Sequence, residues 1–248
     1  MFSLAGKTAL VTGSRTGIGQ AVAVGLAQAG ADLILHGHHD DLAETEAAVR
    51  AEGRQASRFV LDLADPQGVQ PACDRWLAGR QVDILVNNAG VIRRAPAAQA
   101  DAAQWREVLA VNLDSLFALT QWAGARMLAR RCGKVVNLAS VLSFQGGVNV
   151  AAYAASKHAV VGLTRALANE WAGSGVQVNA IAPGYITTAN TEALRADTAR
   201  EAAIRSRIPA GRWGTPADLA GAAVFLASAA SDYVSGHVLA VDGGWLSR

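Results

Sequence analysis

The sequence TGSRTGIG, residues 12–19, separates two patterns of different period. Residues 7–12 (KTALVT) form a short apolar and β-branched run, which is typical of a buried strand. Over residues 17–29 apolar residues recur at helical spacing. Glycines at such a turn let the backbone approach a pyrophosphate, and the N-terminus of the following helix offers unpaired N–H groups and a partial positive charge. Because this is the first strand-to-helix connection, we interpret it as a dinucleotide-binding turn.

The alternation of strand and helix continues along the chain. Further helices are predicted at residues 41–51 and 152–171, after the third and fourth strands, and after Pro216. Parallel neighbouring strands need crossover connections, which helices supply. The sequence therefore predicts an α/β fold, a Rossmann-like doubly wound parallel sheet that makes residues 1–248 a single domain. The other six strands are expected at residues 31–36, 58–62, 82–87, 133–140, 176–183 and 237–244.

Residues 184–214 interrupt this alternation. The stretch is polar, contains several arginines, and follows the sixth strand, and we expect it to contain a short helix or two. In a doubly wound sheet, ligands bind beyond the carboxyl ends of the strands. We therefore predict that residues 184–214 form a lid over a bound ligand.

The composition excludes several classes of protein. With 248 residues, 51% hydrophobic and 17% charged, the chain suits a large core and not a disordered state. The net charge is +2 and no basic run is present, so no nucleic-acid partner is expected. No secretory pattern and no stretch near the roughly 18–20 apolar residues of a membrane span is found, so a cytoplasmic protein without membrane contact is expected. Cys73 and Cys132 match neither a redox pair nor a zinc site, which predicts two reduced, partly buried thiols.

Residues 153–160 (YAASKHAV) contain one of only three lysines in the chain. Tyr153 and Lys157 are four residues apart and so share one face of the predicted helix. A phenol has an ordinary pKa near 10, too high for an efficient base at neutral pH. A neighbouring ammonium favours the phenolate, and its compact charge suits ribose hydroxyls better than the flat fork of arginine. Ser140 ends its strand, where its hydroxyl can donate to a substrate oxygen.

Together these motifs resemble those of the classical short-chain dehydrogenases/reductases, over essentially the whole chain. The resemblance implies hydride transfer between NAD(P) and an alcohol or ketone, by a subunit that is usually tetrameric. The motifs that carry it are residues 12–19, NNAG at 87–90, Asn112, Ser140, Tyr153-x-x-x-Lys157, and the pair Pro183 and Gly184.

The same resemblance assigns roles to individual residues. Asn112 is expected to support a water-linked proton path to the lysine. The catalytic residues that it implies are Asn112, Ser140, Tyr153 and Lys157. The implied cofactor contacts are Gly13, Arg15, Thr16, Gly17, Ile18, Gly19, Gly37, Asp62, Leu63, Asn88, Ala89, Gly90, Tyr153, Lys157, Pro183, Gly184, Ile186 and Thr188.

The choice between NAD(H) and NADP(H) depends on the end of the second strand. A carboxylate about 20 residues after the glycines would bind the ribose 2′-hydroxyl and repel a 2′-phosphate. Gly37 stands at that position, whereas Arg15 and His38 can accommodate a phosphate. Asp40 and Asp41 either cap the next helix or disfavour a phosphate. We expect weak discrimination with a slight lean to NAD(H), and we expect Gly37→Asp to shift the preference further toward NAD(H).

Three of the five histidines, His36, His38 and His39, lie in the same segment. They suggest either a metal site or an exposed loop beside the ribose. We favour the exposed loop and predict no metal.

Within the family, the chain is similar to bacterial sugar-acid dehydrogenases, the branch of 2-deoxy-D-gluconate 3-dehydrogenase and 2-keto-3-deoxygluconate 5-dehydrogenase. The resemblance is carried by GVIRRAP at 90–96, SVLSFQGG at 140–147 and APGYITTANTEALRAD at 182–197. It implies a small 2-keto-3-deoxy or 2-deoxy aldonate as substrate. Arg94, with Arg93 as second choice, is expected to bind the carboxylate, unless both arginines are simply solvated on their loop. Gln145 and Asn190 are expected to bind hydroxyls.

Two other functions fit parts of the sequence. A nucleotide-sensing protein can use this fold without catalysis, but it has no need of Ser140, Tyr153 and Lys157 together. A 3-oxoacyl carrier-protein reductase would need a basic docking surface and an apolar channel, and the sequence shows neither clearly.

The last residues bear on assembly. The segment HVLAVDGGWLSR contains the predicted last strand, and Trp245 and Leu246 follow it with the pattern of exposed apolar residues. In the family that the chain resembles, the last strand and the tail commonly pack across a subunit interface, and two long helices pair into a dimer. We therefore expect a homotetramer.

Overall fold

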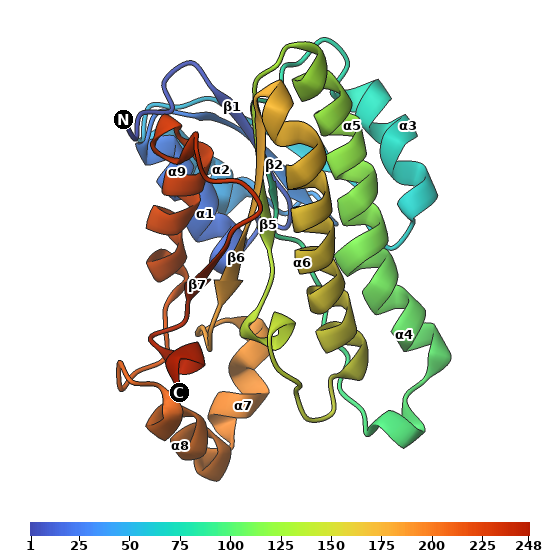
Figure 1. Ribbon diagram of the computed structural model, residues 1–248, viewed down its shortest axis with the longest axis vertical. Coiled ribbons are helices and arrows are strands. Elements are labelled where there is room, and N and C mark those ends of the chain that lie inside the picture. Colours follow the sequence, from blue (N-terminus) through green and yellow to red (C-terminus); the bar gives the residue numbers. More distant parts are fainter.

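A computed structural model describes all residues, 1–248, and contains the predicted parallel sheet (Figure 1). The seven strands are hydrogen-bonded in the order β3-β2-β1-β4-β5-β6-β7, and every pair is parallel. The Rossmann-like fold class is thereby confirmed. The strands are β1 Thr8–Val11, β2 Asp32–Gly37, β3 Ala56–Val60, β4 Ile84–Asn87, β5 Gly133–Leu138, β6 Val176–Pro183 and β7 Val238–Val241.

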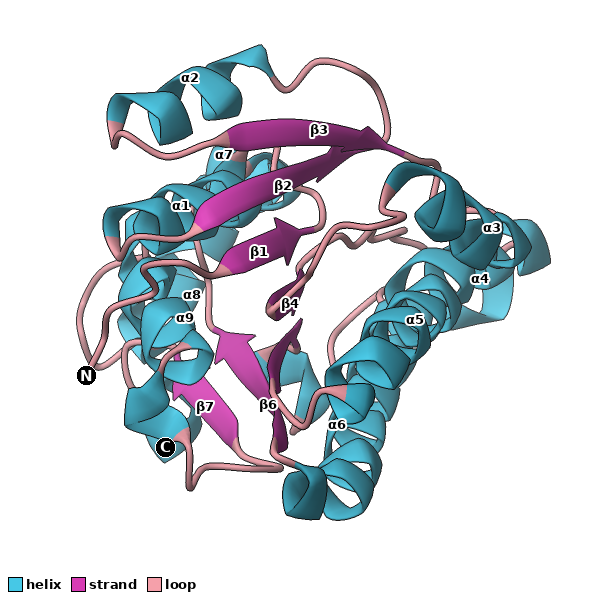
Figure 2. Cartoon of the chain, turned by 90° about the horizontal axis from the view of Figure 1, so that it is seen from above, coloured by secondary structure: helices cyan, strands magenta, loops and turns pink.

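Helices cover both faces of the sheet (Figure 2). One face is covered by α1, α2 and α9, and the other by α3, α5 and α6. The principal helices are α1 Gly17–Gln28, α2 Ala43–Ala51, α3 Pro66–Trp76, α4 Ala102–Leu109, α5 Ser115–Ala129, α6 Ala151–Trp171, α7 Glu192–Ala196, α8 Thr198–Arg207 and α9 Ala220–Ala227.

Two apolar cores lie between the sheet and its helices because successive strand residues point to opposite faces. In β1, Ala9 and Val11 pack into the core beneath α1 and α9, whereas Leu10 packs beneath α3 and α5. All three are fully buried. The strands are therefore apolar on both faces, which explains why they read as continuous apolar runs and not as alternating ones.

From β1 the chain runs outward through β2 and β3 to one edge of the sheet, and it then returns to β4, which is beside β1, and runs outward to the other edge. Helices α1 and α3 consequently lie on opposite faces, and the carboxyl ends of β1 and β4 are the place where doubly wound sheets bind their ligands. The segment after β6 extends beyond this end of the sheet, where it forms α7 and α8 (Figure 1). A parallel bridge between Ile186 and Gly214 joins its two ends. The predicted short helices are confirmed, and closure of the lid stays a prediction.

The structure excludes one of the two roles considered for Asp40 and Asp41, and it contradicts the expected exposure of Trp245. Asp40 and Asp41 do not cap α2: the residue before the helix is Leu42, and no side chain caps it. Trp245 is not exposed, because only 3% of its surface is accessible within the single chain. Cys73 is buried and Cys132 is exposed, and both are unpaired. None of the helices has the length and hydropathy needed to span a bilayer.

Candidate active site

The glycine-rich turn between β1 and α1 has the backbone shape that a dinucleotide requires. Gly13 and Gly17 have φ angles of 62° and 61°, which favour glycine. At Gly19, a Cβ atom would lie 2.1 Å from the carbonyl oxygen of Gly13, so only glycine lets the first turn of α1 start this close. Thr188 lies across the turn, with its Cγ2 3.5 Å from the place that a Cβ of Gly17 would occupy. The turn therefore fits a diphosphate held on the N-terminus of α1.

The segment after β4 is joined to this turn by hydrogen bonds. The Oγ1 of Thr12 accepts from the N–H groups of Asn88 and Ala89, at 2.9 and 3.0 Å. The side-chain amide of Asn88 donates to the carbonyl oxygens of Thr12 and Gly13, at 2.9 and 3.1 Å. The carboxyl ends of β1 and β4 are thus held together by these hydrogen bonds.

Ser140 and Tyr153 meet at the carboxyl end of β5. Ser140 caps a short 3₁₀ helix, η3 (Val141–Ser143), where its Oγ accepts from the N–H of Leu142 at 3.1 Å. Tyr153 lies in the first turn of α6, and the Ser140 hydroxyl acts to lower the pKa of its phenol. The Ser140 proton is not used by the cap, so it can be donated to an oxygen placed between the two hydroxyls.

The environment of Tyr153 shifts its acidity in two directions. Burial raises the pKa of the phenol, whereas the Ser140 hydrogen bond and the positive charge of Arg94 lower it. Arg94 is a cation whose charge lowers the pKa of the Tyr153 phenol, and the role expected of Lys157 stays a prediction. The ammonium of Lys157 lies 5.7 Å from the centre of the Tyr153 ring and donates to the carbonyl oxygen of Leu138. Burial lowers the pKa of Lys157 to about 8.

Asn112 lies next to the lysine, in an unusual stretch of helix. It is in a π-helical turn, η2 (Ala110–Asp114), between α4 and α5, and is completely buried. Its Oδ1 accepts from the N–H of Val91 at 2.8 Å, and its Nδ2 donates to the carbonyl oxygen of Val91 at 3.0 Å. Such π-turns frequently mark functional sites. This one fixes Asn112 beside Gly90, where a Cβ atom would lie 3.3 Å from its Oδ1 and 3.8 Å from the Nζ of Lys157.

At the ribose end of the predicted cofactor site, two basic side chains each lie near a carboxylate. The Nε of Arg15 lies 3.4 Å from a carboxylate oxygen of Asp41, and the Nε2 of His38 lies 3.3 Å from Asp62. All four side chains are about half exposed. A Cβ atom at Gly37 would lie 2.9 Å from the carbonyl oxygen of His39, so Gly37→Asp would strain the loop as well as add a charge. That substitution is consequently a poor test of cofactor choice.

The histidines of this segment do not form a metal site. His36 is buried, and the rings of His38 and His39 stack on each other with their centres 4.1 Å apart. No group of three or more histidine, cysteine, aspartate or glutamate side chains in the chain is arranged to hold a metal ion.

The structure separates the two candidate arginines. Arg93 makes a paired ionic contact with Glu107 of α4, at 2.9 and 2.5 Å, so its guanidinium is already occupied. Arg94 donates to the carbonyl oxygen of Asn190 in the lid segment, at 3.1 Å, and its charge acts on Tyr153. Gln145 is half-buried on the loop after η3, and its side chain makes no hydrogen bond within the chain. Arg94 is therefore the arginine at the reacting end of the site.

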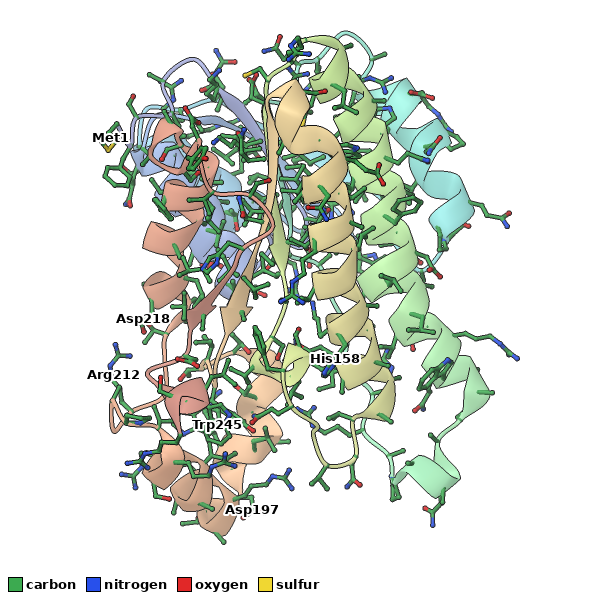
Figure 3. The ribbon with its side chains drawn as sticks, viewed as in Figure 1. Met1, His158, Asp197, Arg212, Asp218 and Trp245 are labelled. Carbon is green, nitrogen blue, oxygen red and sulfur yellow. The ribbon has the colours of Figure 1, made fainter.

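An aromatic cluster beneath the lid was not predicted. Tyr185 follows Gly184 and packs against Trp245, with ring centres 4.6 Å apart, and edge-on against Trp213 at 5.4 Å. The guanidinium of Arg207, from α8, lies 3.9 Å over the Trp245 ring. Figure 3 shows Trp245, near the end of the chain, beside the lid helices, with Asp197 farther out. Tyr185 directly follows Pro183 and Gly184, two predicted cofactor contacts, so its position near the site could have been predicted. No local pattern distinguishes Trp245 from an exposed residue.

His36 was also not predicted as a site residue. It is 2% exposed, near the end of β2, directly behind the glycine-rich turn. Its Nδ1 accepts from the N–H of Gly13 at 3.2 Å, and its Nε2 lies 3.0 Å from the carbonyl oxygen of Leu61. Burial lowers the pKa of His36 to about 4, with smaller influences from His38 and Asp62.

The His36 pKa predicts acid sensitivity. The unfolded chain binds a proton at His36 below about pH 6.5, whereas the folded chain binds it only near pH 4. Stability should therefore fall as the pH is lowered through this window, by up to roughly 3 kcal/mol from this group alone. Urea unfolding of wild type and His36→Gln between pH 7 and 4 measures the difference. Parallel pH dependences for the two proteins would show that His36 does not contribute.

Comparisons with known proteins agree with this geometry. The family described as enoyl-(acyl carrier protein) reductase matches residues 13–246. The chain is 60% identical over 247 residues to 2-dehydro-3-deoxy-D-gluconate 5-dehydrogenase of Bacillus subtilis (strain 168), covering 100% of this chain and 97% of that protein.

Solved structures of similar proteins have the same fold. A Beutenbergia cavernae protein described as an NAD(P)-dependent gluconate 5-dehydrogenase, with NADP bound at low occupancy, has a TM-score of 0.97 and 59% identity, covering 100% and 99% of the two chains. A gluconate 5-dehydrogenase of Burkholderia cenocepacia J2315, in complex with NADP and tartrate, has a TM-score of 0.95 and 43% identity, covering 100% and 98%.

Proposed function

Because the chain belongs to the short-chain dehydrogenase/reductase family and is an NAD(P)-dependent oxidoreductase acting on CH–OH groups, we propose that its substrate is a small sugar acid, a 2-keto-3-deoxy or 2-deoxy aldonate. The observation that carries this proposal is the position of Arg94. The positive charge of its guanidinium lowers the pKa of the Tyr153 phenol. Only one hydrogen bond joins this guanidinium to the lid segment, so its other N–H groups are available to a ligand. A carboxylate a few bonds from the reacting carbon can therefore pair with Arg94.

Tyr153 and Ser140 have different roles in the proposed reaction. In the oxidative direction, the Tyr153 phenolate accepts the hydroxyl proton of the substrate, and Ser140 donates a hydrogen bond to the same oxygen as charge develops on it. In the reductive direction, the phenol returns the proton to that oxygen. The Gly184–Gly214 segment, anchored to Arg94 through Asn190, is suited to exclude water when it closes.

The dinucleotide fits the residues that surround its site. Glycine at 13 and 19 lets the turn, the Asn88 segment and the first turn of α1 pack closely, which leaves the N–H groups at the start of α1 for a diphosphate, and Lys157 lies beside Tyr153 where a ribose is expected. When bound, the nicotinamide ring supplies or takes the hydride. Ser140, Tyr153, Lys157 and Asn112 stay proposed as the catalytic set.

Substrate class can be tested directly. Purified protein is assayed with sugar acids, acyl thioesters and simple secondary alcohols, each with NAD and NADP. We expect the highest kcat/KM on a 2-keto-3-deoxy or 2-deoxy aldonate. Higher kcat/KM on 3-oxoacyl thioesters would favour the 3-oxoacyl carrier-protein reductase. No turnover on any substrate would favour a nucleotide sensor.

For the cofactor, we propose that both dinucleotides are accepted. The lean to NAD(H) has no support from the relatives, since both structures described above contain NADP. Arg15 is the exposed cation at the ribose end, but Asp41 neutralises part of its charge. Arg15→Ala should raise the KM for NADP several-fold more than that for NAD, and Asp41→Asn should lower it. Initial-rate kinetics with both cofactors measure these KM values. Equal changes for NAD and NADP would show that neither residue interacts with the 2′-phosphate.

We also propose a homotetramer. Strand β7 is at the edge of the sheet, with Val238, Leu239 and Val241 only half-buried, and Phe117 on α5 is 41% exposed. Both surfaces are apolar enough to be covered by another subunit. Light scattering at micromolar concentration should give the mass of four chains, whereas a monomer would contradict the proposal. The cytoplasmic location stays a prediction.

A further inference from the structure

His36 joins two segments that border opposite parts of the predicted adenosine site. On one side it meets the glycine-rich turn: besides the Gly13 bond, its own carbonyl oxygen accepts from the N–H of Ser14 at 3.0 Å and from the Ser14 hydroxyl at 3.2 Å. On the other side, its ring meets Leu61, the residue immediately before Asp62. A single buried ring therefore spans from the turn to the segment expected to border the adenine.

The partners of the ring define its protonation state. The N–H of Gly13 can only donate, so the Nδ1 of His36 must carry no proton. The carbonyl oxygen of Leu61 can only accept, so the proton must be on Nε2. A doubly protonated ring would direct an N–H at another N–H and lose the Gly13 bond. The ring is thus held neutral and in one tautomer.

We propose that His36 is a positioning residue for the dinucleotide: as the neutral Nε2–H tautomer it fixes the Gly13 peptide of the turn at a set distance from the Asp62 segment. The proposal rests on dinucleotide binding at this turn and not on the identity of the substrate. The ring holds the N–H of the Thr12–Gly13 peptide while Asn88 holds its carbonyl oxygen, and the φ of 62° at Gly13 is a conformation that favours glycine. If that peptide turned, the Thr12 carbonyl oxygen that Asn88 holds would be displaced with it.

The rest of the turn has an independent anchor, so variants of His36 are expected to fold. The Oγ1 of Thr45, in α2, donates to the carbonyl oxygens of Ser14 and Arg15, at 2.9 and 3.1 Å. This anchor acts beyond Gly13 and does not involve the ring.

Two substitutions separate the functions of the two ring nitrogens. In His36→Asn, the side-chain oxygen can take the place of Nδ1 and keep the Gly13 bond while losing the Leu61 bond. In His36→Gln, the terminal amide can take the place of Nε2 and keep the Leu61 bond while leaving the Gly13 N–H without a partner. Each variant loses one hydrogen bond, so a purely structural role predicts similar effects of the two.

The experiment measures binding of ADP-ribose and of NADP by titration calorimetry, together with kcat at saturating cofactor. We expect His36→Gln to bind ADP-ribose about tenfold more weakly, since a buried unpaired N–H shifts an equilibrium by a factor of that order. We expect His36→Asn to stay much closer to wild type, and kcat to change little in either. Val176→Ala, a buried change at the amino end of β6, controls for loss of stability alone.

A spectroscopic measurement tests the proposed tautomer separately. The ¹⁵N resonances of the His36 ring should show a protonated Nε2 and an unprotonated Nδ1 at pH 7. Equal losses of ADP-ribose affinity in His36→Gln and His36→Asn, a similar loss in Val176→Ala, or a protonated Nδ1 would each overturn the proposal. Failure of the sugar-acid assay would leave these readouts unaffected.

Discussion

Tyr153→Phe should lower kcat by about 10²- to 10⁴-fold while leaving dinucleotide affinity close to wild type, because only the transferable proton is removed. The phenyl ring still fills the first turn of α6 beside Lys157, so the fold is preserved. Burial raises the pKa of this phenol, so alcohol oxidation by the wild-type enzyme, which needs the phenolate, should accelerate as the pH rises toward that pKa. Steady-state kinetics against pH, with cofactor titration of the variant, measure both effects.

Tyr233→Phe is a matched control, since Tyr233 is fully exposed and makes no hydrogen bond through its hydroxyl. It should not change kcat. Lys157→Arg should weaken both cofactor binding and rate, because a larger planar cation must replace an ammonium buried against the Leu138 carbonyl. If Tyr153→Phe retained a rate near that of wild type, another group would have to be the acid and base.

Arg94→Ala should lower kcat/KM for the sugar acid by about one to two decades, the equivalent of roughly 1.5–3 kcal/mol for a charge-assisted hydrogen bond. The loss on a neutral analogue without the carboxylate should be much smaller. It should not be zero, because the Arg94 charge also lowers the pKa of Tyr153, and its removal leaves less phenolate at neutral pH. The loss of carboxylate binding and the change in the Tyr153 pKa can be separated by comparing rates at the high-pH plateau. There Tyr153 is fully ionised in both proteins, so only the loss of carboxylate binding remains.

The neighbouring arginine provides the control for this experiment. Arg93→Ala removes a guanidinium that is already paired with Glu107, so it should leave the selectivity for the acid unchanged. Arg94→Lys keeps the charge near Tyr153 but loses the two-pronged donor, and it should recover the pH profile more completely than the affinity. Equal losses for the acid and the neutral analogue on the plateau would show that Arg94 does not bind the carboxylate.

Much of the site follows from local sequence patterns. Residues four apart share a helix face, so Tyr153 and Lys157 were predicted to lie together, and the structure places them there. The turn after the first strand was predicted because glycines were needed where the backbone is crowded, and Gly19 meets Gly13 in that way. Nothing local, by contrast, indicated that Asn112 would occupy a π-turn.

The sequence by itself determined the order of strands and helices, the parallel sheet, the glycine-rich turn and the catalytic spacing, because each depends on periodicity within a few residues. Only the tertiary structure decided which partners the side chains meet. Arg93 and Arg94 are adjacent and chemically identical, yet one is bound to Glu107 and the other reaches Asn190, 96 residues away. Trp245 was expected to be exposed and is instead buried against Tyr185, and His36 accepts from Gly13 across 23 residues. Such contacts depend on how distant segments pack, which no local pattern encodes.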